Sequence, residues 1–161
     1  MSTEAAARAF FAKPSFAVVG ASNDPAKFGH KIFAWYTAHN LPVTPINPSA
    51  AAIAVGGRDF PTVPQIGALP SPAQTAVSFV TPPPVTLETL RKAQGLGIEA
   101  VWLQPGTFDA AVLAYLNGGS SSAGGQQKPF PTVVAGAGGR GSEGWCVLVD
   151  GERALKANGK L

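Results

Sequence analysis

The sequence contains a single cysteine, Cys146, and no apolar run that approaches the length of a membrane span. One cysteine excludes an internal disulfide framework and any metal site built from several thiolates, and it favours a reducing compartment. A membrane-spanning helix needs about 20 apolar residues, and here glycine, proline or charged residues interrupt every apolar stretch sooner. We therefore expect a soluble, cytoplasmic protein with no membrane partner.

Concentrated charge is also missing. The 12 lysines and arginines are scattered along the chain against 9 acidic residues, which gives a formal net charge of +3. Nucleic-acid binding normally requires a basic face, often with aromatic platforms, so we predict no nucleic-acid partner. A small polyanionic ligand suits this charge balance better. His30 and His39 have no further metal-type ligand at useful spacing and are interpreted as surface or capping residues, which predicts no metal site.

The length of 161 residues is that of one domain with one core. Residues 1–14 are rich in alanine, and Glu4 together with the early first strand favours a short lead-in helix over a transit peptide. Beyond it, apolar runs alternate with helical patterns. The predicted strands are 16–19, 43–46, 76–80, 99–103 and 132–135, and the predicted helices are 27–38, 63–69, 86–95 and 109–116.

Strands separated by helices favour parallel pairing, because parallel neighbours need long crossover connections. We predict the α/β class: a single Rossmann-like domain over 1–161, with a doubly wound, mainly parallel sheet of five to six strands and helices on both faces. The rest of 49–72 is predicted to be irregular, 117–128 a flexible surface loop, and 136–144 a second glycine-rich loop. Residues 150–152 are predicted to form a turn into a terminal helix.

The most informative segment is 16–25, where an apolar run ends in Gly20, Ala21 and Ser22 just before a helical pattern. A helix N-terminus carries free N–H groups and partial positive charge, and these small residues allow a phosphate to approach the backbone. The pattern predicts a phosphorylated ligand. The turn is not a full G-x-G-x-x-G motif, so by itself it is equally compatible with simple turn geometry.

The residues that follow the predicted strands are small, polar or rigid, and none is Asp, Glu, His or Cys. They are Gly20-Ala21-Ser22, Asn47-Pro48, Thr81 to Pro84, Gln104-Pro105-Gly106 and the 136–141 loop. These residues lie at the carboxyl ends of the predicted strands, and that edge of the sheet is therefore suited to binding a ligand rather than to catalysis, unless Cys146 folds back to it. NAD enzymes place an acidic residue after the second strand, where this chain has Asn47, so ordinary nicotinamide dehydrogenases are disfavoured.

Four motifs in order carry a family resemblance: VVGASNDPAKFGHKI, PINP, the Gly57-Arg58 turn with Phe60-Pro61, and GIEAVWLQPG. Together they resemble the small CoA-binding proteins of the Rossmann type, which are relatives of the N-terminal domain of the succinyl-CoA synthetase alpha subunit. The resemblance spans about 16–149, and the ordered combination is far more specific than any single motif. It implies coenzyme A or an acyl-CoA as the ligand.

The resemblance also implies roles for individual residues along that ligand. Gly20, Ala21 and Ser22 would bind the pyrophosphate, and Asn47 with Pro48 would flank the adenosine. Further along the ligand, Val80, Thr81 and Pro82 would follow the nucleotide, and Gln104, Pro105 and Gly106 would lie near the pantetheine arm. Lys31 is added on charge grounds as a phosphate partner, although a lysine at a helix start is more often simply solvated.

Two departures from the synthetase pattern matter. The synthetase has a basic residue after its second strand for the CoA 3′-phosphate, whereas 47–50 offers none, so Arg58 or Arg140 is the candidate partner. The synthetase also needs a later domain with a phosphorylated histidine and a separate nucleotide-binding subunit. We therefore expect no acyl-CoA ligase activity from this chain alone.

The leading hypothesis is a CoA or acyl-CoA binding module without chemistry of its own, acting as a carrier, a sensor or the partner of another enzyme. A second hypothesis is an enzyme that uses bound CoA or a nucleotide, with Cys146 near the ligand thiol. A third is a ligand-free interaction protein. The aromatic first long helix and the two edge strands of an open sheet also suggest a homodimer.

Overall fold

The computed structural model describes residues 2–118 and 128–160, so most of the loop predicted over 117–128 lies outside the described residues. The helices are α1 (Glu4–Phe11), α2 (Phe28–Ala38), α3 (Pro83–Gly95), α4 (Ala110–Leu116) and α5 (Val147–Ala157). The strands are β1 (Ser15–Val19), β2 (Val43–Ile46), β3 (Ala52–Val55), β4 (Arg58–Pro61), β5 (Thr75–Phe79), β6 (Ala100–Leu103) and β7 (Thr132–Val134). Short 3-10 turns occupy Ile66–Ala68 and Pro72–Gln74.

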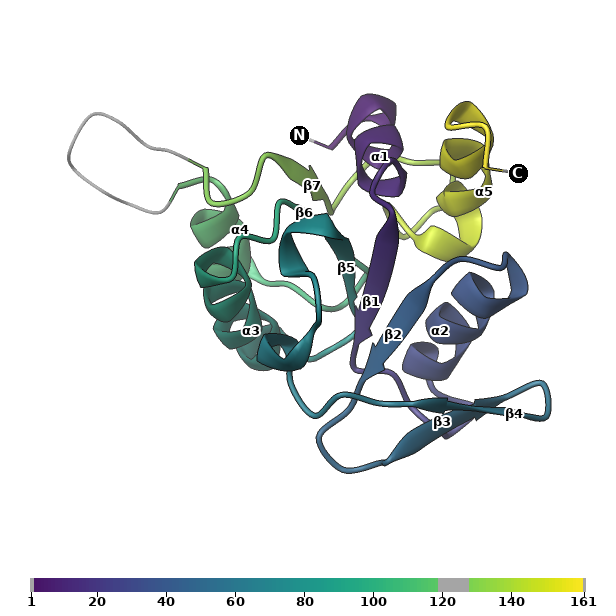
Figure 1. The fold of residues 1–161 in the computed structure, drawn as a ribbon. Coiled ribbons are helices and arrows are strands. Elements are labelled where there is room, and N and C mark those ends of the chain that lie inside the picture. The colour runs from purple at the N-terminus through teal and green to yellow at the C-terminus, as the bar shows by residue number, and fades with distance from the viewer. Residues whose placement is uncertain (1, 119–127, 161) are drawn as a thin grey trace.

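Five strands form one sheet in the order β2-β1-β5-β6-β7, and every pairing in it is parallel. This confirms the predicted doubly wound α/β fold, with five strands in the sheet where five to six were predicted. From β1 the chain crosses through α2 to β2 on one side, and it returns to β5 on the other side (Figure 1). The strand order therefore reverses at β1 and β5, and such a reversal opens a crevice at the carboxyl ends of the two strands.

The sheet is covered on both faces (Figure 1). Helices α1, α2 and α5 lie on one face, and α3 and α4 lie on the other. Successive residues of β1 alternate between the two sides, as the pleat of a strand requires: Phe16 and Val18 pack into the first hydrophobic cluster, and Ala17 and Val19 pack into the second. The nearly continuous apolar run of β1 is explained by this double burial.

Helix α1 is part of the core rather than a simple lead-in. Thr3 caps it by accepting a hydrogen bond from the Ala6 N–H at 3.1 Å. Phe10 and Phe11 are fully buried, and both rings meet Trp102 of β6 edge to face, with centroids 5.5 and 5.8 Å apart. The aromatic contacts join the N-terminal helix to strand β6 of the sheet.

The region predicted to be irregular contains an antiparallel hairpin, β3–β4, so that prediction was wrong for 52–61. Its two-residue turn is Gly56-Gly57, and both glycines have positive φ, at 60° and 78°. This conformation matches the twist of paired strands and is open to glycine at little cost. The Gly-Gly pair directly after the apolar run 52–55 was the signal that could have revealed the hairpin.

Two helices begin earlier than predicted. Helix α3 starts at Pro83 instead of residue 86, because prolines fit the first turn of a helix, where an N–H has no intrahelical partner. The terminal helix α5 already starts at Val147, so the predicted turn at 150–152 was wrong and Asp150 lies in the first turn of that helix. Both errors concern helix ends, where local sequence patterns are weakest.

Tyr36 of α2 is fully buried, and its hydroxyl lies 2.6 Å from the Ser78 Oγ of β5. Burial raises the pKa of Tyr36 strongly. Above pH ~10 the unfolded chain therefore loses this proton while the folded protein keeps it, so the free energy of unfolding falls by about 1.4 kcal/mol per pH unit. Urea unfolding between pH 8 and 11 should show this fall, and Tyr36→Phe should remove it. An unchanged slope in the variant would contradict the prediction.

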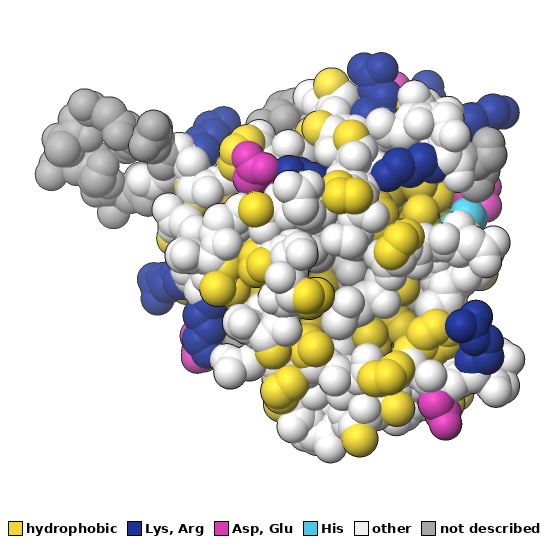
Figure 2. Space-filling model, in the orientation of Figure 1, with side chains coloured by type: hydrophobic (Ala, Val, Ile, Leu, Met, Phe, Trp, Pro, Cys, Tyr) yellow, Lys and Arg dark blue, Asp and Glu magenta, His cyan; other side chains and the backbone are white. Residues whose placement is uncertain are grey.

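None of the helices within the described ranges is long and apolar enough to cross a membrane. On the face shown in Figure 2, lysine and arginine side chains occur in several places, and some of them lie near one another at the upper right.

Candidate functional site

A pocket lies at the carboxyl ends of β1, β2 and β5, where the strand order reverses. Its volume is about 430 Å³. The residues that line it are Gly20, Ala21, Ser22, Lys27, Phe28, Gly29, Asn47, Val80, Thr81 and Pro82. The fold thus brings together seven of the residues selected from the sequence, from three separate segments. We call this the nucleotide pocket.

Two glycines allow α2 to begin almost in contact with the turn after β1. A Cβ on Gly29, in the first turn of α2, would lie 2.0 Å from the carbonyl oxygen of Gly20. Gly20 has φ +94°, and a Cβ there would lie 3.0 Å from the Val80 carbonyl oxygen. Both positions therefore require glycine. At Gly29 the reason is the close packing, and at Gly20 it is both the close packing and the positive φ. The role of Gly29 was not predicted, because this residue lies nine positions after Gly20, outside the usual spacing of such glycines.

The turn after β1 and the start of α2 offer unpaired backbone donors. The N–H groups of Ala21, Ser22, Phe28 and Gly29 make no hydrogen bond to the described part of the chain. All four residues line the pocket. The first turn of α2 also contains no acidic residue, so the positive end of its dipole is not neutralised locally. Such an arrangement binds phosphate groups well.

Hydrogen bonds hold the loop between β1 and α2 in shape. Ser22 Oγ accepts from the Asp24 N–H at 3.1 Å, and the Ser22 carbonyl accepts from the His30 ring Nδ1–H at 2.9 Å. Asn23 pairs with the edge of β3, donating to the Ala52 carbonyl and accepting from the Ala54 N–H, each at 2.8 Å. His30 is therefore a capping residue of the loop, and the hairpin is fixed beside the pocket.

Asn47 and Thr81 line the pocket, but their polar groups already have partners. Asn47 Nδ2 donates to the Ala21 carbonyl at 2.9 Å, and its Oδ1 accepts from two N–H groups in the turn after β2. The Thr81 hydroxyl lies 2.8 Å from Thr86 Oγ1, which itself donates to the Thr81 carbonyl. These side chains shape the pocket walls more than they present free groups to a ligand.

The cation that lines the pocket is Lys27, not Lys31. Lys31 is exposed on α2 and lies outside the lining, so its role as a phosphate partner stays a prediction. Arg140 lines a different cavity, between α1 and α5. Arg58 is on β4, where its guanidinium lies 5.0 Å from the centre of the Phe60 ring. Pro48 follows Asn47 but is exposed and is not part of the lining either.

Gln104, Pro105 and Gly106 follow β6 and lie outside the nucleotide pocket. Gln104 is fully buried, and its Oε1 accepts from the Val147 N–H at 3.0 Å at the start of α5. Its Nε2 has no hydrogen-bond partner among the described residues. The side chain thus ties the end of β6 to α5.

Cys146 immediately precedes α5 and is nearly buried, at 7% exposure. Burial raises the pKa of its thiol, which disfavours the nucleophilic thiolate at neutral pH. Cys146 does not line the nucleotide pocket. Within 2–118 and 128–160 there is also no group of three or more histidine, cysteine or acidic side chains that could hold a metal ion.

A family model described as a CoA binding domain matches residues 14–125. A conserved hypothetical protein from Pyrococcus furiosus is similar in structure, with 30% identity over 63% of this chain and 84% of its own, and a TM-score of 0.57. Two further structures share the fold. A hypothetical protein from Pyrococcus horikoshii OT3 is 24% identical over 69% of this chain and 75% of its own, with a TM-score of 0.59. A protein from Thermus thermophilus is 23% identical over 69% of this chain and 81% of its own, with a TM-score of 0.57. No curated protein matched. The chain belongs to the family of CoA-binding domains.

Proposed function

We propose that this protein binds coenzyme A or an acyl-CoA in the nucleotide pocket as a non-catalytic module, serving as a carrier, a sensor or the partner of another enzyme. The observation that carries the proposal is a group of four backbone N–H groups, on Ala21, Ser22, Phe28 and Gly29, that make no hydrogen bond within residues 2–118 and 128–160. They suit a pyrophosphate, whose oxygens accept several hydrogen bonds at once.

The glycines support the same ligand. Because Gly20 and Gly29 leave no side chain between the turn and the helix, a phosphate can reach both sets of amides. Lys27 adds a positive charge at the same pocket. The side of the pocket formed by Val80 and Pro82 is apolar and would lie along the nucleotide. Since Lys27 is the lysine that lines the pocket, we assign to it the phosphate contact first considered for Lys31.

The non-catalytic part of the proposal rests on the chemistry of the lining. Its residues include no carboxylate, imidazole or thiol, and these are the groups that most often transfer protons or act as nucleophiles. The bound CoA would supply a thiol or thioester, and the protein would position it. Cys146 lies outside the pocket, and burial raises the pKa of its thiol, so both observations favour this role over an enzyme that uses the cysteine.

Titration calorimetry with CoA, dephospho-CoA, NAD and ATP tests the proposal. We expect CoA to bind most tightly, and Lys27→Gln to weaken its binding about tenfold, because a charge-assisted hydrogen bond contributes about 1.5 kcal/mol. Lys31→Gln is the matched control: it removes the same charge four residues further along the helix, outside the pocket, and should leave the affinity unchanged.

The comparison of CoA with dephospho-CoA locates the 3′-phosphate. If Lys27→Gln removes the preference for CoA, Lys27 contacts that phosphate, and if the preference survives, Arg58→Gln is the next variant. Absence of binding to all four compounds would overturn the proposal and favour an interaction protein. Equal losses in the Lys27 and Lys31 variants would show that the lysine in the pocket makes no specific contact.

A further inference from the structure

A second cavity lies between α1, α5 and the glycine-rich loop 136–144, and its volume is also about 430 Å³. Its lining residues fall within 4–8 and 139–157, whereas the family model matches 14–125. The cavity is therefore built entirely from the two ends of the chain, outside the matched domain. It shares no lining residue with the nucleotide pocket. We call it the terminal cavity.

The terminal cavity carries an excess of positive charge. Three arginines line it, Arg8, Arg140 and Arg153, against two acids, Glu4 and Asp150. Neither Arg8 nor Arg140 has a carboxylate within salt-bridge distance in the described parts of the chain. A planar guanidinium without an acidic partner is well suited to a carboxylate or a phosphate.

The two acids differ in their burial and in how strongly their present partners hold them. Asp150 is 4% exposed, and its carboxylate accepts the backbone N–H groups of Arg140 at 2.8 Å and Cys146 at 3.0 Å. It therefore holds the loop on α5. Glu4 pairs with Arg153 at 2.8 Å, but both side chains are more than half exposed. An exposed ion pair of this kind contributes little free energy, so an incoming anion can replace Glu4 at small cost.

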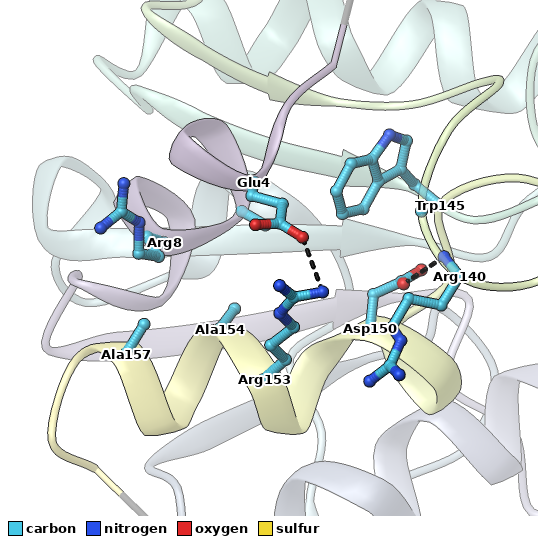
Figure 3. Close-up of a pocket in the computed structure, with 10 residues that line it drawn as sticks. Glu4, Arg8, Arg140, Trp145, Asp150, Arg153, Ala154 and Ala157 are labelled. Atoms are coloured by element: carbon cyan, nitrogen blue, oxygen red, sulfur yellow. Dashed lines mark hydrogen bonds and ion pairs between the residues drawn. The ribbon is translucent and has the colours of Figure 1, made fainter.

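The rest of the lining is apolar. Ala7 and Ala154 contribute methyl groups from α1 and α5, and Trp145 contributes its ring. Figure 3 shows the benzene edge of Trp145 turned toward the Glu4–Arg153 pair, with the ring nitrogen on the opposite edge. Pockets that combine an apolar wall with a few charged groups are typical sites for small organic molecules.

We propose that the terminal cavity binds a small organic carboxylate with an apolar body. Arg140 and Arg153 hold the carboxylate, the body lies against Trp145 and Ala154, and Glu4 competes with the ligand for Arg153. The inference is independent of CoA binding, because the two cavities have no residue in common.

Benzoate is a suitable probe, and benzamide is its neutral counterpart of nearly the same shape. Titration of ¹⁵N-labelled protein should shift the indole N–H resonance of Trp145, assigned from its loss in Trp145→Phe. Benzoate should produce a saturable shift and benzamide should not. Isothermal titration measures the same affinity without that assignment. A saturating concentration of CoA should leave benzoate binding unchanged, which separates this result from the outcome of the CoA titrations.

Three variants test the assigned roles. Arg140→Gln and Arg153→Gln should each weaken benzoate binding about tenfold, through loss of a charge-assisted hydrogen bond. Glu4→Gln should strengthen it about threefold, because the competing ion pair is lost. Arg91→Gln, an exposed arginine on α3, is the control and should have no effect. Equal binding of benzoate and benzamide, no binding of either, or weaker binding in Glu4→Gln would overturn the proposal.

Discussion

Replacing Gly29 by alanine is expected to destabilise the protein by about 3 kcal/mol and to weaken CoA binding about 100-fold. The new Cβ would lie 2.0 Å from the Gly20 carbonyl oxygen, a backbone atom that cannot rotate away. The first turn of α2 must then move off the turn after β1, with a cost at the upper end of that seen for overpacked cores. The movement separates the amides of Phe28 and Gly29 from those of Ala21 and Ser22, and two charge-assisted hydrogen bonds of about 1.5 kcal/mol each correspond to the loss in affinity.

Gly95→Ala is the matched control for this prediction. Gly95 is the last residue of α3, and a Cβ there meets no atom within 4 Å. Alanine is the better helix former, so stability should stay the same or rise by up to about 1 kcal/mol. Urea unfolding gives the stabilities of both variants, and calorimetry gives their CoA affinities. A Gly29→Ala variant as stable as Gly95→Ala would show that α2 does not begin against the β1 turn in solution.

Trp102→Ala is expected to cost about 4 kcal/mol, in the middle of the range for truncating a buried aromatic residue. Trp102 of β6 is fully buried, and its ring contacts Phe10, Phe11 and Trp145 with centroids 5.5, 5.8 and 6.1 Å away. Its Nε1–H also donates to the Trp145 carbonyl at 3.3 Å. The truncation thus loosens both α1 and the glycine-rich loop from β6. The expected loss of stability is a large share of the typical free energy of unfolding, about 5–15 kcal/mol.

Trp102→Phe separates the loss of volume from the loss of the aromatic contact. It keeps a ring against α1 and should cost less than half as much as Trp102→Ala. Urea unfolding measures both variants, and hydrogen exchange of the α1 amides reports whether the helix opens locally. A cost below about 1 kcal/mol for Trp102→Ala would contradict the packing of α1 on the sheet.

The predictions from the sequence were most successful where a pattern is local. The apolar run before Gly20, the small residues of the turn and the helical pattern after it all act over a few residues, because backbone geometry sets the periods of strands and helices. The five strands of the parallel sheet and the residues at the ends of β1, β2 and β5 followed from such patterns. The hairpin β3–β4 had a local signal in Gly56-Gly57 that was not used.

Packing between distant segments was not predictable in this way. Residues 1–14 contain nothing to show that Phe10 and Phe11 lie against Trp102, some 90 residues later. Likewise, Lys27 and Lys31 look equivalent in the sequence. They differ in the structure because the pocket lies at the N-terminal end of α2, so Lys27 lines it and Lys31, one turn further along, does not.

The sequence by itself determined the fold class and the family, since both depend on residue types at short, regular spacing. The tertiary structure decided which side chains share a cavity. It placed Lys27 in the nucleotide pocket, moved Arg140 to the terminal cavity, and gave Gly29 its role through a single close approach. The physical reason is that hydrophobic burial and close packing bring together residues far apart in the chain, and no local pattern records those contacts.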